Sequence, residues 1–257
     1  MLIDPTLDQM LEFCAGDPIE RVFLEDAARR SHSRFRAVQG EHGLEALCYF
    51  GANVVPSGRG CGAFAADAAS RTTRMIIGEE EAVAELWSAA KPVMPSPREY
   101  RPGQPVYVLD EAPAAGSSGL RAATLADLDL LVPACALTHE EEFGVDPLRR
   151  DPTGFRRRTA AQIEEGRSWL WLENGTILFK AEASAWTASA VQLQQVWVDP
   201  EARRQDHGTR GLSDLCRLLL EDTPTVCLFV RPENEPALRL YEKIGMRRSG
   251  SYRSVLF

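Results

Sequence analysis

At 257 residues, with 44% hydrophobic and 26% charged residues, the chain has the composition of a soluble globular protein, long enough for one large domain or two small ones. Its formal net charge of -8 argues against a nucleic-acid partner, which would need concentrated Lys and Arg. No apolar run approaches ~18 residues and the N-terminus has no basic region, so we expect no membrane span, no membrane partner and no signal peptide.

The cysteines predict a reduced, cytoplasmic protein without a metal site. They form no C-x-x-C pair and have no metal-like spacing to His, and most lie in apolar stretches typical of a core. The six are Cys14, Cys48, Cys61, Cys135, Cys216 and Cys227.

The first half reads as a small α/β unit. Apolar spacing predicts a helix within residues 2–13 and another within 19–30, and residues 43–56 are β-prone with a turn or bulge at Gly51 and Asn53. A strand over 74–78, a helix over 79–90 and extended chain over 98–110 complete this half. We predict domains at 1–110 and 118–257, with residues 111–117 as the linker.

One glycine-rich loop in this half, Gly58-Arg59-Gly60-Cys61-Gly62, follows a strand and precedes a helix. Two interpretations are open: a phosphate cradle, or a flexible turn, which short glycine motifs more often are.

The second half begins with a short strand over 119–125 and a helical stretch over 125–143 that Pro133 is expected to interrupt. A second helix is expected after Gly154. Three strands follow over 167–173, 176–185 and 191–198, with a hairpin turn at Asn174-Gly175. The sequence then predicts the elements of the candidate site: a strand–loop–helix unit around 196–219, a buried strand over 225–230, a helix over 232–245 and closing strands over 246–257.

The stretch VWVDPEARRQDHGTRG, residues 196–211, leads a strand through a polar loop into an amphipathic helix. Unpaired N–H groups and the positive end of the helix dipole make such a helix start a seat for phosphate. In the helix over 232–245, Asn234 suits the N-cap and Gly245 the C-terminal end. Asn234, Leu238 and Tyr241 share one face with Ala237 beside them, although a lone Tyr at this spacing is more often a core residue.

Together, VWVDPEARRQDHGTRG and NEPALRLYEKIGM resemble the two signature regions of the GNAT superfamily of N-acetyltransferases. The first is similar to its acetyl-CoA pyrophosphate loop, and the second to its Asn, Ala, Tyr, Gly helix pattern. The whole chain resembles two-part bacterial GNAT proteins with an N-terminal domain of unknown function. The resemblance implies an α/β GNAT fold, a mixed sheet flanked by helices, over 118–257. It also makes a degenerate GNAT-like unit plausible over 1–110.

The resemblance also implies roles for individual residues. Tyr241 would protonate the departing CoA thiolate, and a carboxylate acting through water would be the base for the amine. Candidates for the base are Glu141 and Glu142, in the acidic run that starts at Glu140, or Glu182, although a solvated helix end explains that run equally well. The residues implied to bind acetyl-CoA are Val196, Val198, Arg203, Arg204, Gly208, Thr209, Asn234 and Ala237.

Two residues depart from the family pattern. Asp206 stands where the loop normally has Gly, and Gln195 where similar proteins tend to have a small residue. Two like charges ~4 Å apart repel by about 4 kcal/mol at an effective dielectric of ~20, so an inward Asp206 would hinder pyrophosphate binding. It could instead turn outward, or pair with Arg203, Arg204 or Arg210. We therefore expect weakened rather than abolished binding, and tighter binding after Asp206→Gly.

The leading functional hypothesis is an N-acyltransferase that moves an acetyl or other short acyl group from acyl-CoA to a primary amine, on a small molecule or a protein. The alternative is a catalytically silent GNAT-fold module that binds a ligand or partner between its two halves. Either a monomer or a homodimer is compatible with the sequence, since a tandem pair could form a pseudo-dimer within one chain.

Overall fold

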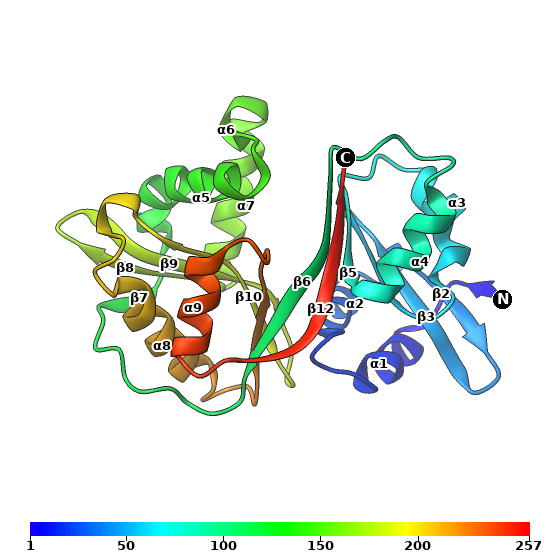
Figure 1. Ribbon diagram of the computed structural model, residues 1–257, viewed down its shortest axis with the longest axis horizontal. Helices are drawn as coiled ribbons and strands as arrows, with labels where there is room; N and C mark the ends of the chain where they lie inside the picture. The colour runs from blue at the N-terminus through cyan, green and yellow to red at the C-terminus, as the bar shows by residue number, and fades with distance from the viewer.

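The computed structural model describes residues 1–257, except for the side chain of His32. Its central feature is one continuous twelve-stranded sheet in the order β1-β2-β3-β4-β5-β12-β6-β11-β10-β9-β8-β7. Figure 1 shows two lobes joined where β6 and β12 run side by side at the centre. Among the described residues, no helix is long and apolar enough to cross a membrane.

The two halves repeat the same order of elements. The first half contains β1 (Leu2–Ile3), α1 (Leu7–Ala15), α2 (Val22–Arg30), β2 (Phe35–Gly40), β3 (Gly43–Phe50), β4 (Asn53–Gly58), α3 (Ala65–Ala69), β5 (Met75–Glu79), α4 (Glu80–Ala90) and β6 (Glu99–Leu109). The second half contains β7 (Leu120–Ala122), α5 (Leu128–Phe143), α6 (Pro147–Arg150), α7 (Pro152–Glu164), β8 (Ser168–Glu173), β9 (Thr176–Trp186), β10 (Val191–Val198), α8 (His207–Leu219), β11 (Val226–Phe229), α9 (Glu235–Lys243) and β12 (Arg247–Leu256). Apart from the short α6, each element of one half has a counterpart in the other.

The halves exchange their last strands. β6, the last strand of the first half, pairs with β11, and β12, the last strand of the second half, pairs with β5. β6 and β12 also pair with each other along most of their length. Residues 110–119 between β6 and β7 contain no helix or strand, and the domain boundaries around them stay a prediction.

Helices cover both faces of the sheet. Successive side chains along a strand point to opposite faces, so both faces carry apolar residues that a helix can cover. In the second half, Leu170 and Trp197 pack under α5 and α7, whereas Trp171 and Phe179 pack under α8 and α9. The first half repeats this arrangement, with α1 and α2 over one face and α3 and α4 over the other. At the junction, Val22 and Phe23 of α2 pack against strands of the second half.

Several predicted boundaries were wrong. Pro133 does not interrupt α5, because it is exposed and removes only one backbone bond early in the helix. α7 begins at Pro152 rather than after Gly154, since Asp151 caps it by accepting from the Gly154 N–H at 2.8 Å. The closing segment is a single strand, β12. No strand was predicted at β2, in which only Phe35 and Ala37 are buried.

Candidate active site

The site begins where two parallel strands separate. β10 pairs with β11 only at Val191 and Gln192, so its remaining edge on that side is free of strand partners. A β-bulge between Gln194 and Trp197 bends the strand, and Gln195 takes a left-handed φ of 54° in it. Val196 lies in the bulge and Val198 beyond it, along the open edge where a further extended segment could pair.

The loop after β10 leads into the N-terminus of α8. Asp206 occupies the N-cap with a left-handed φ of 64°, and its side chain forms no capping hydrogen bond. Gly208 and Thr209 form the first turn, whose N–H groups have no partner within the helix. A Cβ at position 208 would lie 3.3 Å from a methyl group of Val198, so glycine keeps this turn close to the open strand.

The Asp206 carboxylate pairs with a residue that the sequence analysis did not name. Its Oδ1 lies 2.6 Å from Lys243 Nζ at the end of α9, with both side chains half exposed. This contact, together with the Thr209 hydroxyl, lowers the pKa of Asp206. Neither Arg203 nor Arg210 is its partner: Arg210 Nε donates to the Gly116 carbonyl at 2.9 Å and holds the segment before β7.

Arg203 and Glu141 form an ion pair. Arg203 Nη2 lies 2.9 and 3.0 Å from the two Glu141 oxygens, and Nε donates to the Val198 carbonyl at 3.2 Å. Glu141 is half exposed, and Glu140 is also exposed. Because its carboxylate is already neutralised, Glu141 is a weaker candidate for the base than the sequence suggested.

Tyr241 lies on α9 and lines the same cleft as the open edge of β10. It is buried, and its ring centroid is 5.6 Å from that of Tyr107. Burial raises the pKa of its phenol, and the nearby charge of Glu142 raises it further, so the hydroxyl keeps its proton at neutral pH. On the same helix, Asn234 is the predicted N-cap, with its side-chain oxygen accepting from the Ala237 N–H at 3.3 Å.

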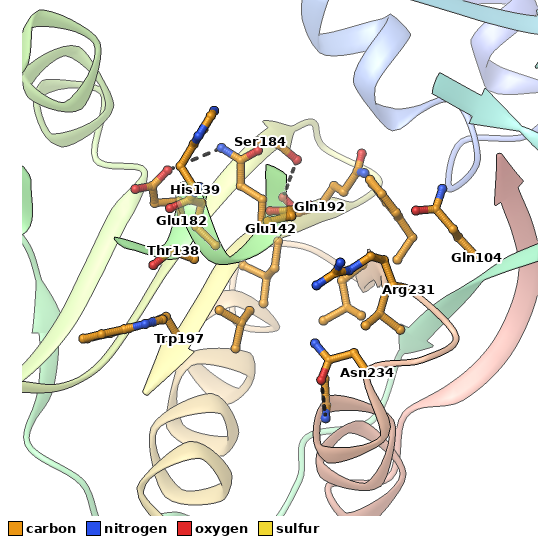
Figure 2. Close-up of a pocket in the computed structure, with 18 of the residues that line it drawn as sticks. Gln104, Thr138, His139, Glu142, Glu182, Ser184, Gln192, Trp197, Arg231 and Asn234 are labelled. Atoms are coloured by element: carbon orange, nitrogen blue, oxygen red, sulfur yellow. Dashed lines mark hydrogen bonds between the residues drawn. The ribbon is translucent and has the colours of Figure 1, made fainter. Parts of the chain in front are cut away.

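Two carboxylates point into the cleft above the sheet. Burial raises the pKa of Glu142, while the charges of Arg101, Arg231 and Lys180 oppose this shift. Glu182 is buried on β9, next to His139 and Thr138 in Figure 2. Of the four acidic candidates, these two are the ones that the fold brings inward.

A buried lysine is the feature that the sequence analysis missed. Lys180 is only 1% exposed, and its Nζ lies 3.0 Å from the Gln195 side-chain oxygen and 3.3 Å from the Gln195 carbonyl. Gln195 is therefore held against Lys180 at the bulge. Glu182, 4.0 Å from the ammonium, also accepts from the Cys135 thiol at 3.1 Å. A charged residue amid the apolar run ILFKAEASA was the available signal.

Most of these residues, although not Lys180, line one cleft of about 1440 Å³ that extends into the first half of the chain. From the second half it is lined by the start of α8, the open edge of β10, Glu142 and Glu182. From the first half it is lined by Glu20, Ser57 and Glu79. All six cysteines are buried and free, and no group of three metal-ligating side chains occurs among the described residues.

The equivalent seat in the first half is filled by the protein itself. The Glu85 carboxylate of α4 accepts from the N–H groups of Gly60 and Cys61 at 2.7 and 2.9 Å. Glu79 likewise accepts from the Ser57 hydroxyl and from the Gly58 N–H. The Gly58–Gly62 loop does cradle an anion, but that anion is a side chain of the same chain.

Comparison with known proteins agrees with this geometry. Residues 134–246 match the model of the acetyltransferase (GNAT) family, and residues 33–131 match a domain of unknown function, DUF4081. The chain therefore contains a DUF4081 domain at residues 33–131, followed by a GNAT acetyltransferase domain at residues 134–246. The two-part GNAT resemblance predicted from the sequence is confirmed.

Solved structures show the same fold over nearly the whole chain. A GCN5-related N-acetyltransferase from Sphaerobacter thermophilus has a TM-score of 0.61 and 17% identity, covering 99% of this chain and 94% of its own. A GNAT-family acetyltransferase from Colwellia psychrerythraea has a TM-score of 0.60 and 10% identity, covering 100% and 98%. A tandem GNAT protein from the clavulanic acid biosynthesis pathway has a TM-score of 0.55 and 12% identity, covering 97% and 93%. The first half is thus GNAT-like too, as expected. A comparison with curated proteins found no significant match.

Proposed function

We propose that the protein is an N-acyltransferase that moves an acetyl or other short acyl group from acyl-CoA to a primary amine. The observation that carries the proposal is that the open edge of β10, the helix start of α8 and Tyr241 line the same cleft. The pantetheine arm would pair with Val196 and Val198, and the pyrophosphate would bind the first turn of α8 at Gly208 and Thr209.

The remaining predicted cofactor residues would assist. Arg204 is exposed in the loop with a left-handed φ of 65°, and Arg203 could reach the pyrophosphate by leaving Glu141. Asn234 and Ala237 form the first turn of α9, facing the arm. No step requires a metal in this proposal.

When bound, acyl-CoA supplies an activated thioester carbonyl. Glu142 would take the proton of the acceptor ammonium through water, since its raised pKa makes it a stronger base than an ordinary glutamate. The acyl C–N bond then forms as the C–S bond breaks, and the proton that the nitrogen loses on becoming an amide replaces the one that Tyr241 gives up. Tyr241 would hold its phenol proton toward the sulfur and donate it to the leaving thiolate, whose basicity the same desolvation increases.

The acceptor amine would belong to a small molecule or to a protein, and the enzyme would act as a monomer or homodimer. Six free, buried cysteines suit a reducing compartment, which supports a cytoplasmic location. The exchange of β6 and β12 supports a pseudo-dimer within one chain.

The decisive experiment is release of free thiol from acetyl-CoA with a panel of primary amines, comparing wild type with Tyr241→Phe. We expect kcat to fall by about 100-fold in the variant, the usual scale for loss of a general acid. Tyr107→Phe is the matched control, because it removes a neighbouring hydroxyl that is already bonded to Glu242 at 3.0 Å. Equal rates for wild type and Tyr241→Phe would remove Tyr241 from the mechanism.

A catalytically silent binding module is the second candidate, and the observation that favours it is Asp206 at the N-cap of α8. It predicts that acetyl-CoA or its analogues bind weakly and that no amine in the panel releases thiol. Calorimetric titration with acetyl-CoA beside the thiol assay separates the two candidates.

A further inference from the structure

Arg231 lies directly beyond β11, where the strands separate. Along β11, Leu228 packs into the core under α8 and α9, whereas Phe229 faces the other way, with its ring 5.0 Å from that of Tyr252. Arg231 lies two residues past the end of β11 and lines the same cleft as Phe229. Its half-buried side chain lines the cleft, above Asn234 in Figure 2.

Two other arginines that line the cleft, Arg101 and Arg158, are committed to partners. Arg101 donates to both oxygens of Glu99 at 2.6 and 2.7 Å, and to the carbonyl of Glu142 at 2.8 Å. Arg158 pairs at 3.3 Å with the carboxylate that caps α7. Arg231 differs: its carbonyl accepts from the Asn234 N–H at 3.0 Å, but within the described part of the chain its side chain has no hydrogen bond and no ion pair within 4.0 Å.

The Glu142 carboxylate lies in the same cleft, and it too has no ion pair within 4.0 Å among the described residues. The charges of Arg101 and, to a smaller extent, Arg231 oppose the upward shift that burial causes in the pKa of Glu142. The Arg231 guanidinium and the Glu142 carboxylate therefore both line the cleft, and neither forms an ion pair within 4.0 Å among the described residues. A guanidinium offers a planar fork of donors that matches the oxygens of a carboxylate or phosphate.

Building on the proposed function, we propose that the acceptor is an amine that also carries a carboxylate or phosphate group. Arg231 binds this anion, and the amine lies toward Glu142. Arg231 is then a specificity residue, and acceptors without an anionic group bind poorly.

The test compares matched acceptors in wild type, Arg231→Gln and Arg231→Lys. Glycine and β-alanine carry a carboxylate, 2-aminoethyl phosphate carries a phosphate, and ethylamine and propylamine carry neither. Thiol release gives kcat and KM, and calorimetry in the presence of CoA gives affinity without turnover. Arg158→Gln is the control, since it removes the same charge from the cleft wall but from an arginine that already has a partner.

We expect wild type to bind at least one anionic amine more tightly than the plain amines. Arg231→Gln should raise KM and Kd for that amine by about 10- to 100-fold, leave plain amines within about 2-fold and leave kcat largely unchanged. Arg231→Lys should recover part of the loss, and Arg158→Gln should resemble wild type. The carboxylate and phosphate arms identify which anion the site prefers.

Failure of the anion site and failure of the proposed acyl transfer would give different results. Acetylation of amines with the same preference in wild type and Arg231→Gln overturns the anion site and leaves the acyltransferase standing. Arg231-dependent binding of glycine, β-alanine or 2-aminoethyl phosphate without thiol release supports the anion site and contradicts the proposed reaction. Equal loss for anionic and plain amines, or no binding of any anionic amine, also overturns the anion site.

Discussion

Replacing Lys243 by Gln would leave the Asp206 carboxylate without its cation at the start of α8. In the wild type the two side chains are 2.6 Å apart, and this contact keeps the pKa of Asp206 low, so the carboxyl is charged at neutral pH. A lone carboxylate there would repel the pyrophosphate that we propose binds to the same helix start. Loss of Lys243 should therefore weaken acetyl-CoA binding through Asp206.

The size of the effect follows from the charges. Two unit charges ~8 Å apart repel by about 1 kcal/mol at an effective dielectric of ~40, so the double charge of the pyrophosphate gives about 2 kcal/mol, or roughly 30-fold in Kd. In the wild type, Lys243 cancels most of this repulsion. Asp206→Gly should consequently tighten binding by only about 2- to 5-fold, although glycine suits the left-handed φ of 64° better.

Calorimetric titration with acetyl-CoA of the wild type, both single variants and the double variant measures this coupling. We expect Lys243→Gln to bind about 30-fold more weakly than wild type, and the double variant to bind within a few-fold of Asp206→Gly. The loss should shrink at high salt. Equal weakening by Lys243→Gln in both backgrounds would refute the reasoning, since Lys243 would then act on the ligand directly.

Three further predictions concern other carboxylates. Glu142→Gln should lower kcat by about 100-fold with little change in acetyl-CoA affinity. The loss of rate at low pH that the wild type shows should be absent from the variant. If the variant still loses rate at low pH, Glu182 is the base instead. Burial raises the pKa of Glu20 from 4.5 to about 7, so the native state binds the extra proton, and wild-type stability should fall by up to about 3 kcal/mol as pH rises from 5 to 8. The free energy of unfolding of Glu20→Gln, measured with urea, should not fall over this pH range. The same pH dependence in both proteins would contradict the role of Glu20. Glu85→Ala should lower stability by about 1 kcal/mol by freeing the N–H groups of Gly60 and Cys61, and an unchanged thermal unfolding midpoint would show that the loop does not need the carboxylate.

Much of the second half was predictable because its signals are local. The Asn174-Gly175 turn, the Asn234 cap and the Gly245 stop each act within a few residues, and each lies where it was predicted. The capping pair Asp151-Pro152 carried the same kind of signal, and reading it would have placed the start of α7 correctly.

The orientation of charged side chains was not predictable in the same way. Nothing local separates Glu141, which pairs with Arg203, from Glu142, which is drawn into the cleft by the packing of α5 beside Arg101. Asp206 likewise finds Lys243, which is 37 positions away in sequence. The partner of a long charged side chain can lie on an element that is distant in sequence, so the pairing depends on how the elements pack.

The sequence by itself determined the class of protein, because a strand, a polar loop and a helix start are specified by neighbouring residues, as is the face of α9 that carries Asn234 and Tyr241. Only the tertiary structure decided how the two halves combine. The exchange of β6 and β12 depends on hydrogen bonds between residues more than 100 positions apart, and it gives the cleft walls from both halves. The tertiary structure also decided that the first half closes its own anion seat with Glu85, whereas the N-cap residue of α8 makes no capping hydrogen bond and leaves the N–H groups there for the ligand that we propose.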